Sequence, residues 1–239
     1  MRALIAGLGL IGGSIGIALR ARGWRVAYLD PFVDDAGEAA DERVSAFVDA
    51  DMVVVATPVD VAVEQVAERR GQGAGVVTSV CSVMGPLRAV AGENFVAGHP
   101  FAGSEKRGLA AARGDLFVGK PWFVDREHPL VAQLVDACGA KLEVVDAGDH
   151  DRAVALTSHL PQLLSTALAA QLGSVDERFI GTGLKTFLRL AESDASVWAP
   201  VLTANESNIS EHLDAVVRIA REMLRGDAGA FARAQRFVR

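Results

Sequence analysis

The residues that decide the fold are Ala3-Leu-Ile-Ala-Gly-Leu-Gly-Leu-Ile-Gly12, close to the amino terminus. The first four are apolar, which predicts a short buried strand, and residues 14–21 have the pattern of a helix. Between a strand and a helix, Gly7 can form a tight turn, Gly9 lets the backbone approach a pyrophosphate, and Gly12 lets the helix pack on the strand. The amides at the helix start would stabilise the phosphate charge. The stretch therefore predicts a dinucleotide-binding unit.

An acidic residue after the second predicted strand points to the cofactor. Residues 25–29 form that strand, and Asp30 follows about 18 residues after Gly12, near the roughly 20 expected of a carboxylate that binds the ribose hydroxyls. It would repel a 2′-phosphate, so we expect NAD rather than NADP, and a glycine-rich turn without a ligand is less favoured. The residues predicted to bind NAD are Gly7, Gly9, Leu10, Ile11, Gly12, Asp30, Thr57 and Pro58, the last two directly after a third strand at 52–56.

Two kinds of pattern divide the rest of the chain. Up to about residue 147, short apolar runs alternate with helical segments, which predicts a mostly parallel sheet covered by helices. From about residue 149 the strand signals stop and long helical patterns follow. We therefore expect an α/β Rossmann-type domain over residues 1–147 and an all-α helical domain over 148–239. The further predicted strands are 76–80, 95–98, 122–124 and 142–145, and the predicted helices are 60–70, 130–138, 149–171, 175–191, 199–225 and 228–237.

Composition and charge limit the class of protein. The 239 residues are 50% hydrophobic and 23% charged, with a net charge of -6. This is typical of a globular chain, and the sign of the charge argues against nucleic acid or membrane partners. Cys81 and Cys138 lie far apart with no second pair, which excludes a disulfide framework and a zinc ribbon, so we expect a reducing, cytoplasmic setting and no metal. A signal peptide is disfavoured because the glycines between residues 7 and 16 would weaken its helix.

A histidine in a loop-like run is the candidate general base. His99 lies in Gly98-His-Pro-Phe-Ala-Gly-Ser-Glu-Lys106, after the strand predicted at 95–98, at the edge where α/β sheets bind ligands. Imidazole titrates near neutral pH, which suits proton transfer from an alcohol that loses hydride. An ordinary polar loop residue is the alternative on spacing alone.

Two features of the helical half could face a substrate. Pro161 stands in Thr157-Ser-His-Leu-Pro-Gln162 and removes a backbone hydrogen bond. We expect a kink that turns Ser158 and Gln162 toward a cleft, although packing alone would also explain it. Arg189 is a candidate for bidentate capture of a carboxylate, with a surface ion pair as its alternative.

Six motifs in order resemble those of the prephenate and arogenate dehydrogenases of tyrosine biosynthesis. This family implies a Rossmann domain followed by a helical domain that binds substrate and forms a homodimer. It also implies oxidative decarboxylation of prephenate by NAD, which yields 4-hydroxyphenylpyruvate, CO2 and NADH. The motifs are GLGLIGGS at 7–14, SVCSVMGP at 79–86, GHPFAGSEKRG at 98–108, TSHLPQ at 157–162, LKTFLRLAESDASVW at 184–198 and NESNISEHLD at 205–214.

The resemblance also implies roles for single residues. His99 matches the catalytic histidine, which binds the ring hydroxyl and accepts its proton, and Ser82 matches the serine that positions it. Arg189 matches the arginine that holds the substrate carboxylate. Other positions around the substrate pocket are matched by Ser104, Glu105, Ser158 and Trp198.

Three positions depart from the family pattern. Ser79 and Met84 replace an acid and a lysine near Ser82, which weakens the expected local support there. Gln162 replaces a histidine that contacts the side chain of prephenate. A neutral Gln162 would tolerate the ammonium of arogenate better, so we expect that arogenate dehydrogenase or dual specificity is the alternative.

Two other classes of function stay open. Another β-hydroxyacid dehydrogenase would also join a Rossmann domain to helices, and it would typically use a lysine such as Lys185 in its second domain. A noncatalytic NAD-binding sensor would bind NAD and lose nothing when His99 is replaced.

Overall fold

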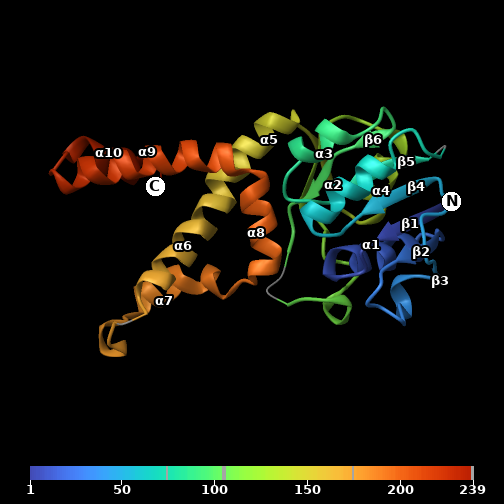
Figure 1. Ribbon diagram of the computed structural model, residues 1–239, viewed down its shortest axis with the longest axis horizontal. Helices are drawn as coiled ribbons and strands as arrows, with labels where there is room; N and C mark the ends of the chain where they lie inside the picture. The colour runs from blue at the N-terminus through green and yellow to red at the C-terminus, as the bar shows by residue number, and fades with distance from the viewer. Residues whose placement is uncertain (74, 104–105, 174, 238–239) are drawn as a thin grey trace. The chain divides into compact units, whose positions relative to one another are not determined.

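The first part of the chain forms a twisted parallel sheet. The computed structural model describes residues 1–239 except 74, 104–105, 174 and 238–239. Six strands pair in parallel in the order β3-β2-β1-β4-β5-β6 (Figure 1). This is the strand order of a Rossmann fold, with the order reversing between β1 and β4. The strands are β1 Arg2–Ala6, β2 Arg25–Leu29, β3 Glu42–Arg43, β4 Met52–Val55, β5 Val76–Ser79 and β6 Phe95–Val96. The predicted parallel sheet is confirmed.

The strands are apolar throughout because both faces of the sheet are covered. Neighbouring residues of a strand pack into different buried clusters. Ile5 of β1 and Val54 of β4 belong to one cluster, and Leu4 and Val53 belong to the other. Such double burial is typical of parallel sheets with helices on both sides. The covering helices are α1 Leu10–Ala21, α2 Val59–Glu68, α3 Gly85–Val90 and α4 Pro129–Ala137, with short 3-10 helices η1 Gly37–Ala39 and η2 Leu109–Ala111.

A second, three-stranded sheet holds the candidate histidine. It consists of β7 Gly98–Pro100, β8 Pro121–Val124 and β9 Lys141–Val144, with β7 antiparallel to β8. The single strand predicted at 95–98 is therefore wrong, because the chain leaves the main sheet after β6. Gly98 permits the crossing, since a Cβ there would lie 2.7 Å from the Ser79 carbonyl oxygen.

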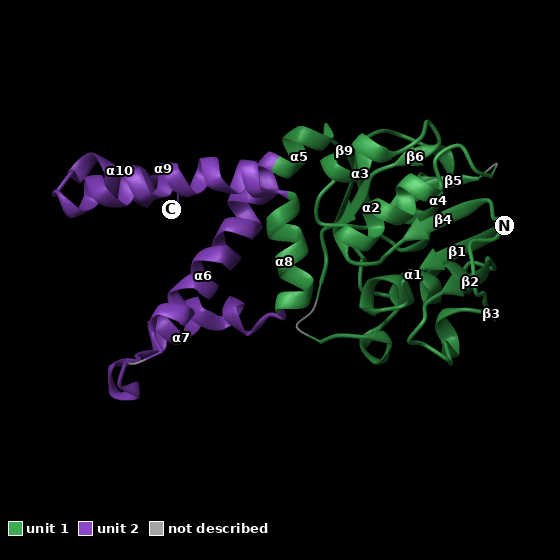
Figure 2. Ribbon diagram, in the orientation of Figure 1, with its two compact units in different colours: residues 1–151, 195–204 green, residues 152–194, 205–239 purple. Residues whose placement is uncertain are grey.

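The chain divides into two compact units (Figure 2). Unit 1 comprises residues 1–151 and 195–204, and unit 2 comprises 152–194 and 205–239. The expected division at residue 147 differs from these units mainly in helix α8, Ala195–Ala204. This helix belongs to unit 1 because Val201 is buried in one of its core clusters.

Unit 2 is helical, with one interruption next to Pro161, where the sequence predicts a kink, and others that the sequence pattern did not show. The helix predicted at 149–171 contains a π-helical turn at Ala155–His159, just before Pro161. The helix predicted at 175–191 is wrong before residue 182, where the chain forms a 3-10 turn at Glu177–Phe179 alone, and the helix predicted at 199–225 is broken at Asn205. The elements are α5 Ala147–Val154, which runs from unit 1 into unit 2, η3 Ala155–His159, α6 Leu160–Gln171, η4 Glu177–Phe179, α7 Thr182–Leu188, η5 Arg189–Glu192, α9 Glu206–Leu224 and α10 Ala228–Phe237.

Large apolar side chains stay exposed on unit 2. They come from several of its helices and turns, and the unit by itself leaves them uncovered: Leu168, Phe179, Phe187, Val217, Leu224, Phe231 and Phe237. Apolar exposure on this scale is typical of a surface that contacts another protein. Among the described residues, no helix combines the length and the apolar character needed to span a bilayer.

Candidate active site

The glycine-rich turn after β1 has the shape of a phosphate cradle. Gly7 has φ +90, and a Cβ on it would lie 2.7 Å from the Ala56 carbonyl oxygen. A Cβ on Gly12 would lie 2.0 Å from the Gly7 carbonyl oxygen, so α1 packs closely on the turn. Gly9, in contrast, has no atom within 4 Å of its added Cβ and faces open space. The backbone is therefore open at the position where a pyrophosphate would approach it.

The first amides of α1 lie beside this opening. Leu10 and Ile11 are half-buried and begin the helix, so their N–H groups have no acceptor within it. Thr57 and Pro58 follow β4 at the same edge, and the Thr57 nitrogen would be 2.9 Å from a Cβ on Gly7. Thr57 Oγ1 donates to Gln65 Oε1 at 2.8 Å, which fixes the segment. The structure thus brings these predicted cofactor residues together.

Asp30 closes the other side of the cradle. Its Oδ2 accepts the Leu8 N–H at 2.8 Å, and its Oδ1 accepts the Phe32 N–H at 2.8 Å. A cavity of about 670 Å³ lies next to it, lined also by Arg43. Arg43 pairs with Asp34 at 2.5 Å, so a carboxylate already balances its charge. Nothing in the sequence indicates that Arg43 lies beside Asp30, because β3, which carries it, is too short to be recognised as a strand.

His99 and Ser82 lie in unit 1. His99 is half-buried on β7, and Ser82 is half-buried in the loop between β5 and α3. The two segments are joined at Ser79, whose Oγ accepts the Gly98 N–H at 3.3 Å. Ser79, one of the departures from the family pattern, therefore supports the strand that carries His99.

A buried dyad contacts His99, and sequence reasoning assigned it no role. His99 Nδ1 lies 2.9 Å from His150 Nε2, and His150 Nδ1 lies 2.8 Å from Asp151 Oδ1. Asp151 accepts the N–H groups of Met84 and Gly85, each at 2.8 Å. His150 and Asp151 are 3% and 4% exposed. The signal available in the sequence was an adjacent histidine and acid at the start of a predicted helix.

Aromatic rings border the two histidines. The rings of His99 and Phe101 meet edge to face with centroids 5.5 Å apart, and Phe123 lies 5.8 Å from His150. Phe101 is exposed, whereas His150 is buried, and a buried environment strengthens the hydrogen bonds that His150 makes. Cys81 is also buried, and burial raises the pKa of its thiol to about 12, so it stays protonated at neutral pH.

The other predicted substrate residues divide between the units. Trp198 is half-buried on α8 in unit 1, packed against a core cluster. Ser158 is half-buried in the π-helical turn of unit 2, and Arg189 is exposed at the start of η5. Ser104 and Glu105 lie outside the described residues.

Gln162 is buried in unit 2, close to the segment that carries Arg189. Its Nε2 donates to the Leu190 carbonyl oxygen at 2.7 Å and to Thr166 Oγ1 at 3.1 Å. Its Oε1 is buried and has no hydrogen-bond partner among the described residues. The amide therefore has one unused acceptor, while its donors are used within the unit.

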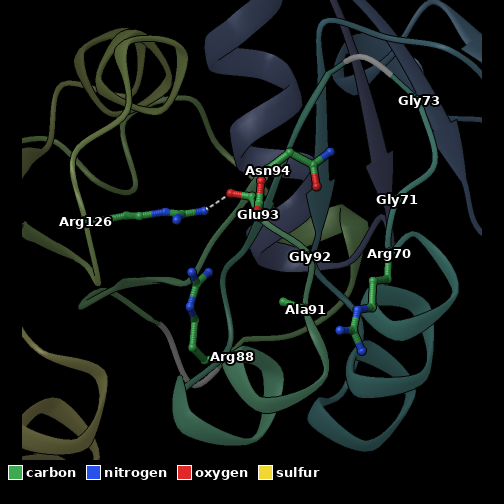
Figure 3. Close-up of a pocket in the computed structure, with 9 residues that line it drawn as sticks. All are labelled: Arg70, Gly71, Gly73, Arg88, Ala91, Gly92, Glu93, Asn94 and Arg126. Carbon is green, nitrogen blue, oxygen red and sulfur yellow. Dashed lines mark hydrogen bonds between the residues drawn. The ribbon is translucent and has the colours of Figure 1, made fainter.

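A separate cavity of about 590 Å³ lies at the amino ends of β5 and β6, lined by Arg70, Arg88 and Arg126 (Figure 3). Arg88 pairs with Asp125 at 3.4 Å, and Arg126 donates to backbone carbonyls. It contains none of the predicted residues and lies opposite the edge where such sheets bind ligands. The described residues hold no group of histidine, cysteine and acidic side chains suited to a metal.

Comparisons with known proteins agree on one family. Residues 33–147 match the prephenate dehydrogenase nucleotide-binding domain, and residues 146–227 match the prephenate dehydrogenase dimerization domain. A probable prephenate dehydrogenase of Streptomyces niveus is 33% identical over 93% of this chain and 67% of its own length. The prephenate dehydrogenase of Bacillus subtilis is 29% identical over 90% of this chain and 67% of its own. The chain thus spans about two thirds of the length of these relatives.

Solved structures show the same fold. Prephenate dehydrogenase from Aquifex aeolicus, in complex with hydroxyphenyl propionate and NAD+, has a TM-score of 0.85 at 24% identity, covering 99% of this chain and 96% of that one. Arogenate dehydrogenase from Synechocystis has a TM-score of 0.77 at 22% identity, with the same coverage. The open cradle at Gly9 and the carboxylate of Asp30 fit NAD. The chain belongs to the prephenate dehydrogenase family of NAD-dependent oxidoreductases.

Proposed function

We propose that this enzyme oxidatively decarboxylates prephenate to 4-hydroxyphenylpyruvate and CO2 while NAD is reduced to NADH. The observation that carries the proposal is His99, a residue of β7 whose Nδ1 lies 2.9 Å from His150 Nε2 and whose ring meets Phe101 edge to face. It lies in the unit that also carries the predicted NAD cradle. Bound NAD supplies the acceptor for the hydride that leaves the ring carbon bearing the hydroxyl.

His99 first accepts the proton of the ring hydroxyl and later returns it to the same oxygen. Hydride departure leaves positive character on the carbon, and His99 relieves it by accepting the hydroxyl proton as the C–O double bond forms. The bond between the ring and its carboxylate then breaks, and its electron pair enters the ring, which becomes aromatic. His99 returns the proton to the ring oxygen, so the product is a phenol. Ser82 would position the hydroxyl near His99.

The remaining residues would bind and orient the substrate. Arg189 is proposed to hold a substrate carboxylate through two parallel N–H contacts. Ser104, Glu105, Ser158, Gln162 and Trp198 are proposed to line the pocket, and the cofactor contacts are proposed at Gly7, Gly9, Leu10, Ile11, Gly12, Asp30, Thr57 and Pro58. Orientation of the ring carbon is the larger part of the task, since aromatisation drives decarboxylation.

Arogenate is the second candidate substrate, and Gln162 favours it. The donors of the Gln162 amide are taken by Leu190 and Thr166, while its buried Oε1 has no partner among the described residues. An ammonium group supplies donors to such an oxygen, whereas a keto acid offers acceptors alone. We therefore expect arogenate to be used as well as, or instead of, prephenate.

A homodimer through the helical domain is part of the proposal. Residues 146–227 match the dimerization domain of the family. Phe179, Leu224 and Phe237 are exposed in unit 2. Covering these side chains with a second copy would remove a large apolar surface from water.

The test is NADH formation by the purified enzyme, with NAD or NADP offered separately and prephenate or arogenate as substrate. We expect turnover with NAD and at least one of the two acids. His99→Asn should lower kcat by about 100-fold or more and leave NAD affinity unchanged. His128→Asn is the matched control, since His128 caps α4 and asparagine also caps helices well. NAD binding without turnover of either acid would refute the proposal.

A further inference from the structure

We propose that His150 and Asp151 are positioning residues that fix the proton of His99 on Nδ1 and so make Nε2 the nitrogen that accepts the substrate proton. This inference rests on the proposed role of His99 as general base. Its basis is a continuous set of hydrogen bonds, from His99 Nδ1 to His150 Nε2 at 2.9 Å and from His150 Nδ1 to Asp151 Oδ1 at 2.8 Å.

The contacts of Asp151 determine which atom is the donor and which is the acceptor in each of these hydrogen bonds. Both of its carboxylate oxygens accept backbone N–H groups, Oδ1 from Met84 and Oδ2 from Gly85. A backbone N–H cannot exchange its role for that of an acceptor, so both oxygens act as acceptors. His150 Nδ1, which contacts Oδ1, must therefore carry a hydrogen and donate it.

That assignment passes on to His99. A neutral imidazole has one N–H and one lone pair. With its hydrogen on Nδ1, His150 has its lone pair on Nε2 and can only accept from His99. His99 Nδ1 must then be the donor, which leaves the lone pair of His99 on Nε2. The chain of contacts thus selects one tautomer of His99, the one in which Nε2 is basic.

The same contacts stabilise the charge that forms during the reaction. When His99 takes the hydroxyl proton it becomes an imidazolium, and its bond to His150 becomes charge-assisted and stronger. His150 is 3% exposed and lies beside Phe123, so little water weakens the interaction. Asp151 supplies the balancing negative charge two bonds along the chain of contacts, and His99 gives the proton back as the ring becomes aromatic.

The helix that carries the dyad is itself anchored. Asp146 Oδ1 accepts the N–H groups of Gly148 at 2.8 Å and Asp149 at 3.1 Å, which fixes the first turn of α5. His150 and Asp151 follow in that turn. A fixed helix start holds a positioning group more accurately than a loop does.

Two substitutions of His150 isolate the acceptor role. Both His150→Leu and His150→Gln lose the bond to Asp151, and only glutamine keeps an oxygen that can accept from His99 Nδ1. We expect His150→Leu to lower kcat by about tenfold or more without changing KM or NAD affinity. His150→Gln should recover most of that loss, and Asp149→Asn, an exposed carboxylate on the same helix, should act like wild type. Equal kcat in wild type and His150→Leu would overturn the proposal.

Asp151→Asn tests the tautomer directly. Asparagine has one acceptor oxygen, so it cannot accept from Met84, Gly85 and His150 together, and the tautomers of the two histidines are no longer fixed. The analogous change in a serine protease triad lowers kcat about 10⁴-fold through a wrong histidine tautomer. We expect a loss in kcat with an unchanged KM.

Nuclear magnetic resonance of ¹⁵N-labelled histidine reads the tautomer without any substrate. The wild-type His99 should be protonated on Nδ1 and unprotonated on Nε2, and Asp151→Asn should weaken this preference. A wild-type His99 with its hydrogen on Nε2 would overturn the inference even if the enzyme is active. Wild-type enzyme that shows the expected tautomer but turns over neither acid would sustain the positioning contact and refute the proposed function.

Discussion

Two glycines of the cradle should respond to alanine in different ways. Gly12→Ala adds a methyl group 2.0 Å from the Gly7 carbonyl oxygen, where ordinary contact begins at 3.4 Å. The obstacle is backbone, so α1 and β1 must separate by more than about 1 Å. Gly9→Ala adds a methyl group with no atom within 4 Å, at φ -83, which alanine adopts without strain.

The expected magnitudes follow from these contacts. Overpacking of this kind destabilises by about 1–3 kcal/mol, and a clash with backbone belongs at the upper end. Alanine recovers up to about 1 kcal/mol through its higher helix propensity. We therefore expect Gly12→Ala to lose about 2 kcal/mol, or about 4–8 °C in Tm. Gly9→Ala should change stability by less than about 1 kcal/mol, since it alters an N-cap residue alone.

Binding of NAD separates the two variants. The methyl group of Gly9→Ala would occupy the approach of the pyrophosphate, so we expect NAD affinity to fall about 10- to 100-fold with a nearly unchanged Tm. Gly12→Ala should lower both the NAD affinity and the Tm. Calorimetric titration gives the affinity, and the rise in Tm on adding NAD checks it independently. Wild-type NAD affinity in Gly9→Ala, or an equal loss of Tm in both variants, would refute the assignment of the glycine-rich turn as the site of the NAD pyrophosphate.

Three other perturbations have definite expected results. Asp30→Asn removes the charge that repels a 2′-phosphate, and Arg43 lines the same cavity, so the ratio of kcat/KM with NAD to that with NADP should fall about tenfold or more. Arg189→Ala should raise the substrate KM about 30-fold with a similar kcat, as expected when hydrogen bonds to a charged group worth about 2 kcal/mol are lost; Lys185→Ala is the control, and loss of kcat there would favour the lysine-based alternative. Burial raises the pKa values of Cys81 and Cys138 from 9.0 to about 12, so the unfolded chain releases their protons first and stability should fall above pH 9, by up to about 1.4 kcal/mol per pH unit for each thiol; denaturant titrations should show a shallower fall in Cys138→Ala.

The parallel sheet could be predicted because its signals are local. Continuous apolar runs such as 52–55 are buried on both faces, and the glycine turn with Asp30 marks the switch point of the sheet. The strand at 95–98 was wrong because the break after Val96 depends on a distant contact. Gly98 passes Ser79 too closely for a side chain, and no periodicity records that.

The helical half was harder to predict for a different reason. Helical periodicity identifies a face but is insensitive to breaks, so the 3-10 turn at Glu177–Phe179 and the non-helical Asn205 were read as helix. Helix α8 joins unit 1 because its Val201 finds an apolar partner there. Which core a helix joins depends on the surfaces available to it, and its own pattern does not specify them.

The support of His99 shows why two departures from the family pattern do not remove it. The dyad reaches back 67 and 66 residues to the main chain of Met84 and Gly85, so the contact arises from topology and leaves no local signal. Because Asp151 binds backbone N–H groups, the side chain at residue 84 is not needed for it. Met84 instead fills a core cluster, and Ser79 uses its hydroxyl to hold β7. The side chain at residue 84 can therefore change and still leave the imidazole of His99 in place, since Asp151 binds the main chain there. At residue 79 the serine hydroxyl takes a different part, because it accepts the Gly98 N–H and so supports β7.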